Sequence, residues 1–357
     1  MGTPTSRPAV PPHSLSPSRA SDFMRCPLLY RFRVIDKLPQ KPNAAAAKGT
    51  VVHAVLERLF DAPAPARTAH RARALVPGEW QRLLERRPEL AGLFAADGPG
   101  AAGEPDAAGS AAGPAEGAAA GAGAPPGAPD APDAPGTPDA PGTPGTPGAP
   151  VDTEALGRWL SEAEALVERW FTLEDPTRLE PAERELFVEV RLDSGLWLRG
   201  IIDRVDVAPT GEVRIVDYKT GKAPRPEFAA EALFQMKFYA LVVWRLKGVV
   251  PRRLQLVYLG SGDVLTYDPD AEELAGLERR LLALWEAIER ATESGDWRPR
   301  RTPLCSWCDH QEHCPEFGGT PPPYPLVLPL PEPRGAAGSA EDTGGGGGGP
   351  APSGADG

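Results

Sequence analysis

Three consecutive segments with a two-residue hydrophobic alternation lie near the middle of the chain, and they constrain its fold more than any other feature. The segments are 185–192, 196–207 and 212–218, and this alternation is typical of strands with one buried face. A Pro-Thr-Gly turn signal precedes the third segment. Short connections between consecutive strands favour an antiparallel meander. We therefore expect three neighbouring strands of one sheet.

Helical patterns lie on both sides of this meander. Serine followed by proline at positions 16 and 17 marks the start of a helix that ends near 26. Further helices are expected near 49–60, at 78–95, 152–171, 227–247 and 270–294, and two more strands at 253–259 and 263–267. Helices, a meander and then alternating helix and strand predict an α/β (α+β) fold with a mixed central sheet flanked by helices.

Two segments differ in composition from the rest of the chain and limit the size of its folded part. Residues 97–150 and 319–357 are rich in Gly and Pro and contain few large apolar side chains, so burial cannot offset the entropy of ordering them. When 1–14 is also set aside, about 250 of the 357 residues remain, enough for one large domain. We expect a disordered N-terminus, one domain at 15–318 with a disordered insert at about 97–150, and a disordered tail.

The formal net charge of −11 resides mostly in the same segments, since 97–150 holds seven acidic residues and no lysine or arginine. The predicted domain is therefore close to neutral, and a nucleic-acid partner is not excluded. No run approaches the roughly 18 apolar residues of a membrane span, and the N-terminus lacks the apolar core of a signal peptide. We expect a cytoplasmic protein with no membrane segment, whose cysteines are ligands or core residues more often than disulfides.

Two of the predicted strands carry charged residues within apolar runs. Asp203 interrupts the run GIIDRVD, and Asp217 and Lys219 are two residues apart, so their side chains share one face of a strand. A buried carboxylate is unfavourable unless it is paired or binds a metal. Two converging carboxylates and a lysine therefore indicate a divalent-metal site. A surface salt-bridge cluster on an edge strand is the alternative interpretation.

Asp203 followed by Asp217-Tyr218-Lys219 resembles the split acid and D-x-K signature of PD-(D/E)XK nucleases. The phrases GIIDRVD and VDYKTGK are similar to those of the RecB-like branch, and His53 stands on an early helix, as it does in that branch.

Two further motifs match the same branch. They are the Q-x-x-x-Y pair Gln235 and Tyr239, and the opening phrase SLSPSRASDFMRCPLLYRFR with its Cys-Pro. The resemblance covers about 15–60 and 180–318, and the insert at 97–150 has no counterpart in it.

The resemblance implies a restriction-endonuclease-like fold and a metal-dependent phosphodiesterase. It implies that His53, Asp203, Asp217 and the backbone carbonyl of Tyr218 hold the metal. Hard oxygen ligands suit Mg²⁺, and a single imidazole also admits Mn²⁺. Lys219 is implied to orient the attacking water and to balance charge in the transition state.

Gln235 and Tyr239 are four residues apart and project from one face of a helix. Glutamine can bind a phosphate or a base edge, and tyrosine can stack on a base or hold the helix in place, so we expect both to act in DNA binding. Ordinary helix packing is an equal alternative for Tyr239. Glu185, at the start of the first strand, is expected to lie behind the metal ligands.

The cysteines form a second constellation. Cys305, Cys308 and Cys314 lie within ten residues, and the remaining cysteine is Cys26. Two nearby histidines keep a zinc site open, and four thiolates also suit a 4Fe–4S cluster. The pattern resembles the iron–sulfur nucleases of the RecB-like branch, which include AddB-type subunits and CRISPR adaptation nucleases. The resemblance implies a structural cluster that ties the N-terminal helix to the C-terminal knuckle.

Basic residues flank both cysteine segments, which favours a nucleic-acid partner bound without base specificity. They are Arg25, Arg31, Arg33, Arg298, Arg300 and Arg301. The sequence thus predicts an exodeoxyribonuclease of the RecB family that acts on single-stranded DNA or DNA ends in repair or recombination. A CRISPR adaptation-type nuclease and a non-catalytic DNA-binding scaffold are the alternatives. The sequence contains no P-loop, so a helicase partner would be a separate chain.

Overall fold

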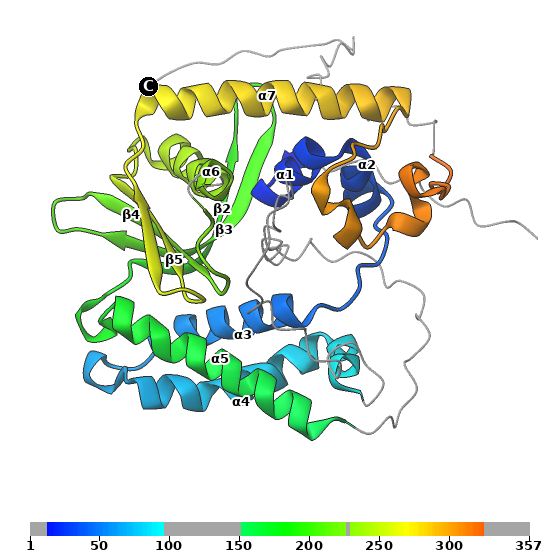
Figure 1. The fold of residues 1–357 in the computed structure, drawn as a ribbon. Helices are drawn as coiled ribbons and strands as arrows, with labels where there is room; N and C mark the ends of the chain where they lie inside the picture. Colours follow the sequence, from blue (N-terminus) through cyan, green and yellow to red (C-terminus); the bar gives the residue numbers. More distant parts are fainter. Residues whose placement is uncertain (1–12, 96–150, 226–228, 325–357) are drawn as a thin grey trace, which may run out of the picture.

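The computed structural model describes residues 13–95, 151–225 and 229–324 (Figure 1). The predicted disordered insert lies outside these residues, as do most of the predicted N-terminal segment and tail. Among the described helices, none combines the length and the apolar composition that a membrane span requires.

A six-stranded mixed sheet forms the centre of the molecule, and the sequence predicts a mixed central sheet and five of these strands. Its strand order is β1-β3-β4-β5-β6, and β2 pairs with β3 at the sheet edge. The strands are β1 (Ser14–Leu15), β2 (Glu183–Arg191), β3 (Trp197–Val207), β4 (Val213–Lys219), β5 (Arg253–Tyr258) and β6 (Asp263–Tyr267). The β2–β3–β4 meander and the β5–β6 pair are antiparallel, whereas β4–β5 and β1–β3 are parallel. The short β1 was not predicted.

Helices cover both faces of this sheet, and the first of them begins at the predicted serine–proline signal. Ser16 caps α1 by accepting a hydrogen bond from the Arg19 N–H group, and Asp152 and Asp270 cap two later helices in the same way. The helices are α1 (Pro17–Arg25), α2 (Pro27–Tyr30), α3 (Ala44–Leu59), α4 (Ala69–Arg86), α5 (Thr153–Leu173), α6 (Ala229–Lys247) and α7 (Ala271–Ser294).

Two helix boundaries differ from the predictions. The helix that carries His53 begins at Ala44 rather than near 49, because Asn43 caps it and a run of alanines favours helix. The helix predicted at 78–95 runs over Ala69–Arg86 and contains Pro77, and a 3₁₀ helix follows at Pro88–Phe94. Proline inside a helix is unfavourable, and this concealed the first half of α4.

Two hydrophobic clusters lie on opposite faces of the sheet. One joins the sheet to α1, α2, α6 and α7, and the other joins it to α3, α4 and α5. On β4, Ile215 belongs to the first cluster and Val216 to the second. Asp217 and Lys219 therefore lie on the α6 side, and Tyr218 points its ring towards α5.

The ends of the described segments are held in place. Ala95 and Val151 form an antiparallel bridge, so the two ends of the insert lie side by side. At the C-terminal end, the Tyr324 hydroxyl donates to the Thr292 carbonyl at 2.9 Å, and its ring packs against Trp297. The packed part of the chain thus continues to Tyr324, beyond the predicted end of the domain at 318.

Candidate metal centre and catalytic site

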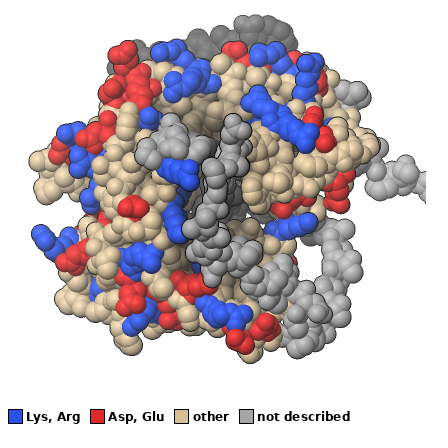
Figure 2. Space-filling model, viewed as in Figure 1, with Lys and Arg blue, Asp and Glu red and all other residues tan. Residues whose placement is uncertain are grey.

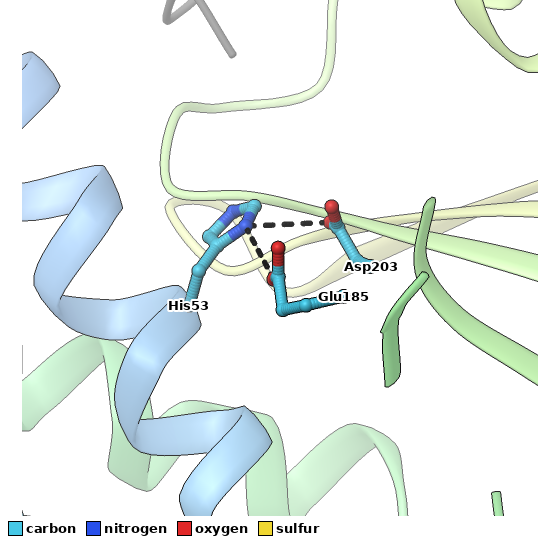
Figure 3. A group of neighbouring side chains, drawn as sticks. All are labelled: His53, Glu185 and Asp203. Carbon is cyan, nitrogen blue, oxygen red and sulfur yellow. Dashed lines mark ion pairs between the residues drawn. The ribbon is translucent and has the colours of Figure 1, made fainter. Parts of the chain in front are cut away.

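Three side chains from three elements converge at one place (Figure 3). His53 comes from α3, Glu185 from β2 and Asp203 from β3. The His53 Nδ1 atom lies 3.4 Å from Asp203 Oδ2 and 3.9 Å from Glu185 Oε1. One ligand atom from each residue lies within 4.8 Å of the other two. A single divalent cation can span this spacing, since its bonds to such ligands are about 2.0–2.6 Å long.

The backbone of Tyr218 lies next to this group and fixes its orientation. The Tyr218 N–H group donates to Asp203 Oδ2 at 2.7 Å, and the Tyr218 carbonyl oxygen lies 2.8 Å from His53 Nε2. A carbonyl only accepts, so Nε2 carries a hydrogen in this arrangement. Nδ1 is then left facing two carboxylates, which is favourable only with a positive charge between them. A proton on Nδ1 or a metal ion meets that requirement.

Asp217 and Lys219 form a buried ion pair beside the group. Asp217 is 1% exposed, and its Oδ2 atom lies 2.7 Å from Lys219 Nζ. Burial raises the pKa of Asp217 to about 6, against the opposing effect of Lys219. Burial and the Asp203 carboxylate raise the pKa of Glu185 to about 7. The carboxylates therefore crowd one another in a poorly solvated place that favours a cation.

The sequence-predicted ligands are brought together only in part. His53, Asp203 and the Tyr218 carbonyl lie together, and Glu185 joins them. Asp217 does not belong to the group of residues whose ligand atoms all lie within 4.8 Å of one another. Its carboxylate is paired with Lys219 instead.

A chain of hydrogen bonds leads from the ion pair into α6. Lys219 Nζ donates to Gln235 Oε1 at 2.9 Å, and Gln235 Nε2 donates to the Tyr239 hydroxyl at 3.1 Å. Tyr239 is 1% exposed. Its ring is closed to stacking on a nucleic-acid base in this structure, which favours the packing interpretation. The chain fixes the position of the lysine ammonium group.

Glu185 lies closer to the candidate ligands than the sequence predicts. Its φ angle is +44°, which is strained for a residue with a side chain. Its neighbours pair with β3, but Glu185 and Asp203 do not pair with each other. Ile202 and Val205 belong to the same hydrophobic cluster although they are three residues apart, so the alternation of β3 also shifts at Asp203. The signal available beforehand was an acid directly opposite Asp203 in an antiparallel pair.

A buried ion-pair network holds Tyr218 from the opposite face of the sheet. Arg204 is 1% exposed and donates to both carboxylate oxygens of Glu174 at 2.7 and 2.8 Å. It also donates to the Tyr218 hydroxyl and lies 3.1 Å from Asp206 Oδ1. The network joins the end of α5 to β3 and β4, directly behind the candidate metal centre.

The four cysteines are free and lie near one another. Cys26 separates α1 from α2, and the knuckle of Cys305, Cys308 and Cys314 lies beside these helices (Figure 1). Each sulfur accepts a hydrogen bond from a backbone N–H group, and the donors are, in the same order, Arg300, Thr302, His310 and Glu316. Burial raises the pKa of the Cys308 and Cys314 thiols, and the backbone N–H groups oppose this effect. Four neighbouring cysteines are a residue set that can bind a metal or an iron–sulfur cluster.

Comparison with known proteins agrees with the class that the fold and the site define. A family model described as the PD-(D/E)XK nuclease superfamily matches residues 14–111 and 139–315. This match includes every residue of the candidate metal centre and covers well over half of the chain. The chain belongs to the PD-(D/E)XK nuclease superfamily, whose members use divalent metals.

Individual relatives match less of the chain. The gene 69 proteins of Mycobacterium phages L5 and D29 are 32% and 31% identical to it over 136 residues. These matches cover 37% of this chain and 44% and 48% of the phage proteins, so the chain spans about half the length of these relatives. This chain also superposes on the crystal structure of a candidate exonuclease from Eubacterium rectale, with a TM-score of 0.47 and 13% sequence identity. The matched region covers 84% of this chain and 88% of the exonuclease chain.

Proposed function

We propose that this protein is a Mg²⁺- or Mn²⁺-dependent DNA nuclease of the RecB-like branch, an exonuclease that acts in DNA repair or recombination. One observation carries the proposal. The Nδ1 atom of His53 faces two carboxylates, next to a buried aspartate–lysine pair. Membership of the superfamily supplies the type of bond that is cleaved, a phosphodiester.

The proposed site contains metal ligands and a residue that acts on the attacking water. A divalent cation in this place would polarise the scissile phosphoryl oxygen and lower the pKa of water. We assign as its ligands His53, Asp203, Asp217 and the Tyr218 carbonyl, and we add Glu185. His53 serves as a ligand only through a nitrogen without a hydrogen, and Nδ1 is that nitrogen while Nε2 donates to the Tyr218 carbonyl. The carbonyl would bind the same cation only after giving up this hydrogen bond, because the two ring nitrogens point in different directions.

Lys219 is the residue that we assign to the attacking water. Its ammonium group has three hydrogens; Asp217 and Gln235 engage two of them, and the third remains to orient a water or a phosphate oxygen. We assign Gln235 and Tyr239 to holding this ammonium group in place. Gln235 is only partly buried, so a contact with DNA is proposed for it as well.

We assign a structural 4Fe–4S cluster to Cys26, Cys305, Cys308 and Cys314. The backbone hydrogen bonds to all four sulfurs support this assignment.

Cleavage of end-labelled DNA tests the proposed function. Linear single- and double-stranded DNA should be degraded from an end with Mg²⁺ or Mn²⁺, and closed circular DNA should survive. Asp203→Asn should lower the rate by about 10²–10³, whereas Asp193→Asn, in an exposed turn, should not. Cleavage of circular DNA at the same rate would refute the exonuclease assignment. DNA binding without any cleavage would favour the scaffold alternative.

A further inference from the structure

One cavity of the described chain lies away from the candidate metal centre. It has a volume of about 410 Å³ and lies where α1 and α2 meet the C-terminal end of α7 and the segment 296–300. The pocket beside His53 has only about 10 Å³, room for about one water or ion. The metal centre itself therefore offers little volume to hold a substrate, and the larger cavity shares no residue with it.

The lining of this cavity combines an apolar floor with a basic rim. The apolar part includes Phe23, which is 8% exposed, together with Pro27 and Ala291. The charged lining residues are Arg290, Arg298, Arg300 and Asp296. Three arginines against one acid leave a positive balance. Figure 2 shows Lys and Arg side chains, with acidic side chains among them, at the upper right of the molecule, the side on which α7 ends.

Two of the arginines pair only with exposed acidic residues. Arg298 contacts Asp296 through Nη2 at 2.8 Å and through Nε at 2.9 Å, and the two side chains are 83% and 50% exposed. Arg290 lies 3.9 Å from Glu286, and both side chains are 68% exposed. Exposed pairs of this kind contribute little. Both guanidinium groups can therefore exchange their present partner for a phosphate.

We propose that this cavity binds the single-stranded part of the DNA substrate, with one unstacked base against the apolar floor and the flanking phosphates on the arginines. A duplex presents phosphates and base edges and keeps its base faces stacked, so it cannot cover an apolar concave surface. A single strand offers both a base face and phosphates. The inference rests on the proposed function for its choice of DNA and adds where the strand is held.

The cavity is joined to the cysteine cluster. The Arg300 N–H group donates to Cys26 Sγ at 3.4 Å, and the Arg300 side chain donates to the Met24 carbonyl at 2.5 Å. One wall of the cavity is thus fixed to the end of α1 at the cysteine that the proposed cluster uses. Strand binding should therefore depend on an intact cysteine cluster, although the cysteines do not line the cavity.

Binding without cleavage tests this proposal. The full chain is titrated, in EDTA, into a fluorescent 20-nucleotide single strand and into a blunt hairpin duplex, and anisotropy is recorded at several salt concentrations. Arg290→Ala/Arg298→Ala should weaken single-strand binding about tenfold. The slope of log K against log salt concentration should become shallower by about 1.4, which corresponds to two lost phosphate contacts. The control Arg279→Ala/Arg280→Ala removes two exposed arginines of the same helix that do not line the cavity.

A second variant separates the base from the phosphates. Ala291→Trp keeps every arginine but fills the cavity, so it should weaken single-strand binding at least fivefold and change duplex binding less than twofold. The proposal would be overturned if the cavity variants bound the single strand as tightly as the arginine control. It would also be overturned if the variants lost single-strand and duplex affinity equally. If the wild type binds the strand through the cavity but never cleaves DNA with Mg²⁺ or Mn²⁺, the proposed function fails and this inference stands.

Discussion

Replacing Lys219 by methionine tests the buried ion pair at the centre of the site. Methionine keeps most of the side-chain volume but leaves the Asp217 carboxylate buried without its cation. Loss of one partner of a buried pair costs about 3–5 kcal/mol. The lower end applies here, because the raised pKa of Asp217 lets this carboxyl group take up a proton. We expect the free energy of unfolding to fall by about 3 kcal/mol.

Urea and thermal unfolding in EDTA measure this loss, since EDTA removes any cation that would replace the lysine. A domain of this size loses about 2–4 °C per kcal/mol, so the melting temperature should fall by about 6–12 °C. Lys237→Met is the matched control. Lys237 pairs with Glu273 at 2.6 Å, but both side chains are more exposed, at 19% and 24%. That change should cost about 1 kcal/mol or less.

Two further measurements identify the cause of the loss. Asp217→Asn/Lys219→Met removes both charges, so it should be more stable than Lys219→Met alone. Mg²⁺ should also raise the melting temperature of Lys219→Met, because a cation that binds only the folded state stabilises it. Equal stability of Lys219→Met and Lys237→Met in EDTA would refute the reasoning. So would a double variant that is no more stable than Lys219→Met.

Three other predictions follow from the structure. Deleting residues 100–148 should leave stability and DNA cleavage nearly unchanged, because the ends of the insert are already paired; loss of folding on deletion would show that the insert is structural. Cys26→Ala should remove as much bound iron as Cys308→Ala in anaerobically purified protein, and stoichiometric zinc without iron in the wild type would refute the cluster. Gly200→Ala should lower the melting temperature, because its Cβ would lie 2.6 Å from Cε1 of the buried Tyr239 ring; a melting temperature equal to that of wild type would show that the ring has room to move.

Those parts of the fold that depend on local pattern were predictable. The alternation of the meander located β2, β3 and β4 to within two residues at each end. The Ser16-Pro17 signal located the start of α1, and the expected ranges 152–171 and 270–294 located α5 and α7. The start of α4 was missed because Pro77 lies inside the helix, and β1 was missed because two residues carry no periodicity. Pairing with β3, a long-range contact, makes β1 a strand.

The candidate site was predictable wherever residue spacing alone decides which side chains meet. Asp217 and Lys219 share a face of β4 because they are two residues apart, and the ion pair follows. Tyr239 is four residues from Gln235, which the spacing shows, but the closed packing of its ring over Gly200 depends on how α6 lies on the sheet. The place of Glu185 depends on a strained backbone angle at the point where two strands fail to pair. No pattern within one segment encodes such a distortion.

Tyr218 connects the candidate metal centre to the buried ion-pair network on the other face of the sheet. Its N–H group and carbonyl oxygen contact Asp203 and His53 on the side of the metal centre. Its ring lies on the other face of the sheet, against Arg204, whose charge is balanced by Glu174 at the end of α5. A shift of this ring would move the carbonyl that we assign as a ligand. The buried network would therefore set the geometry of the candidate metal centre without touching a bound cation, and the sequence reveals it only once β3, β4 and α5 are packed together.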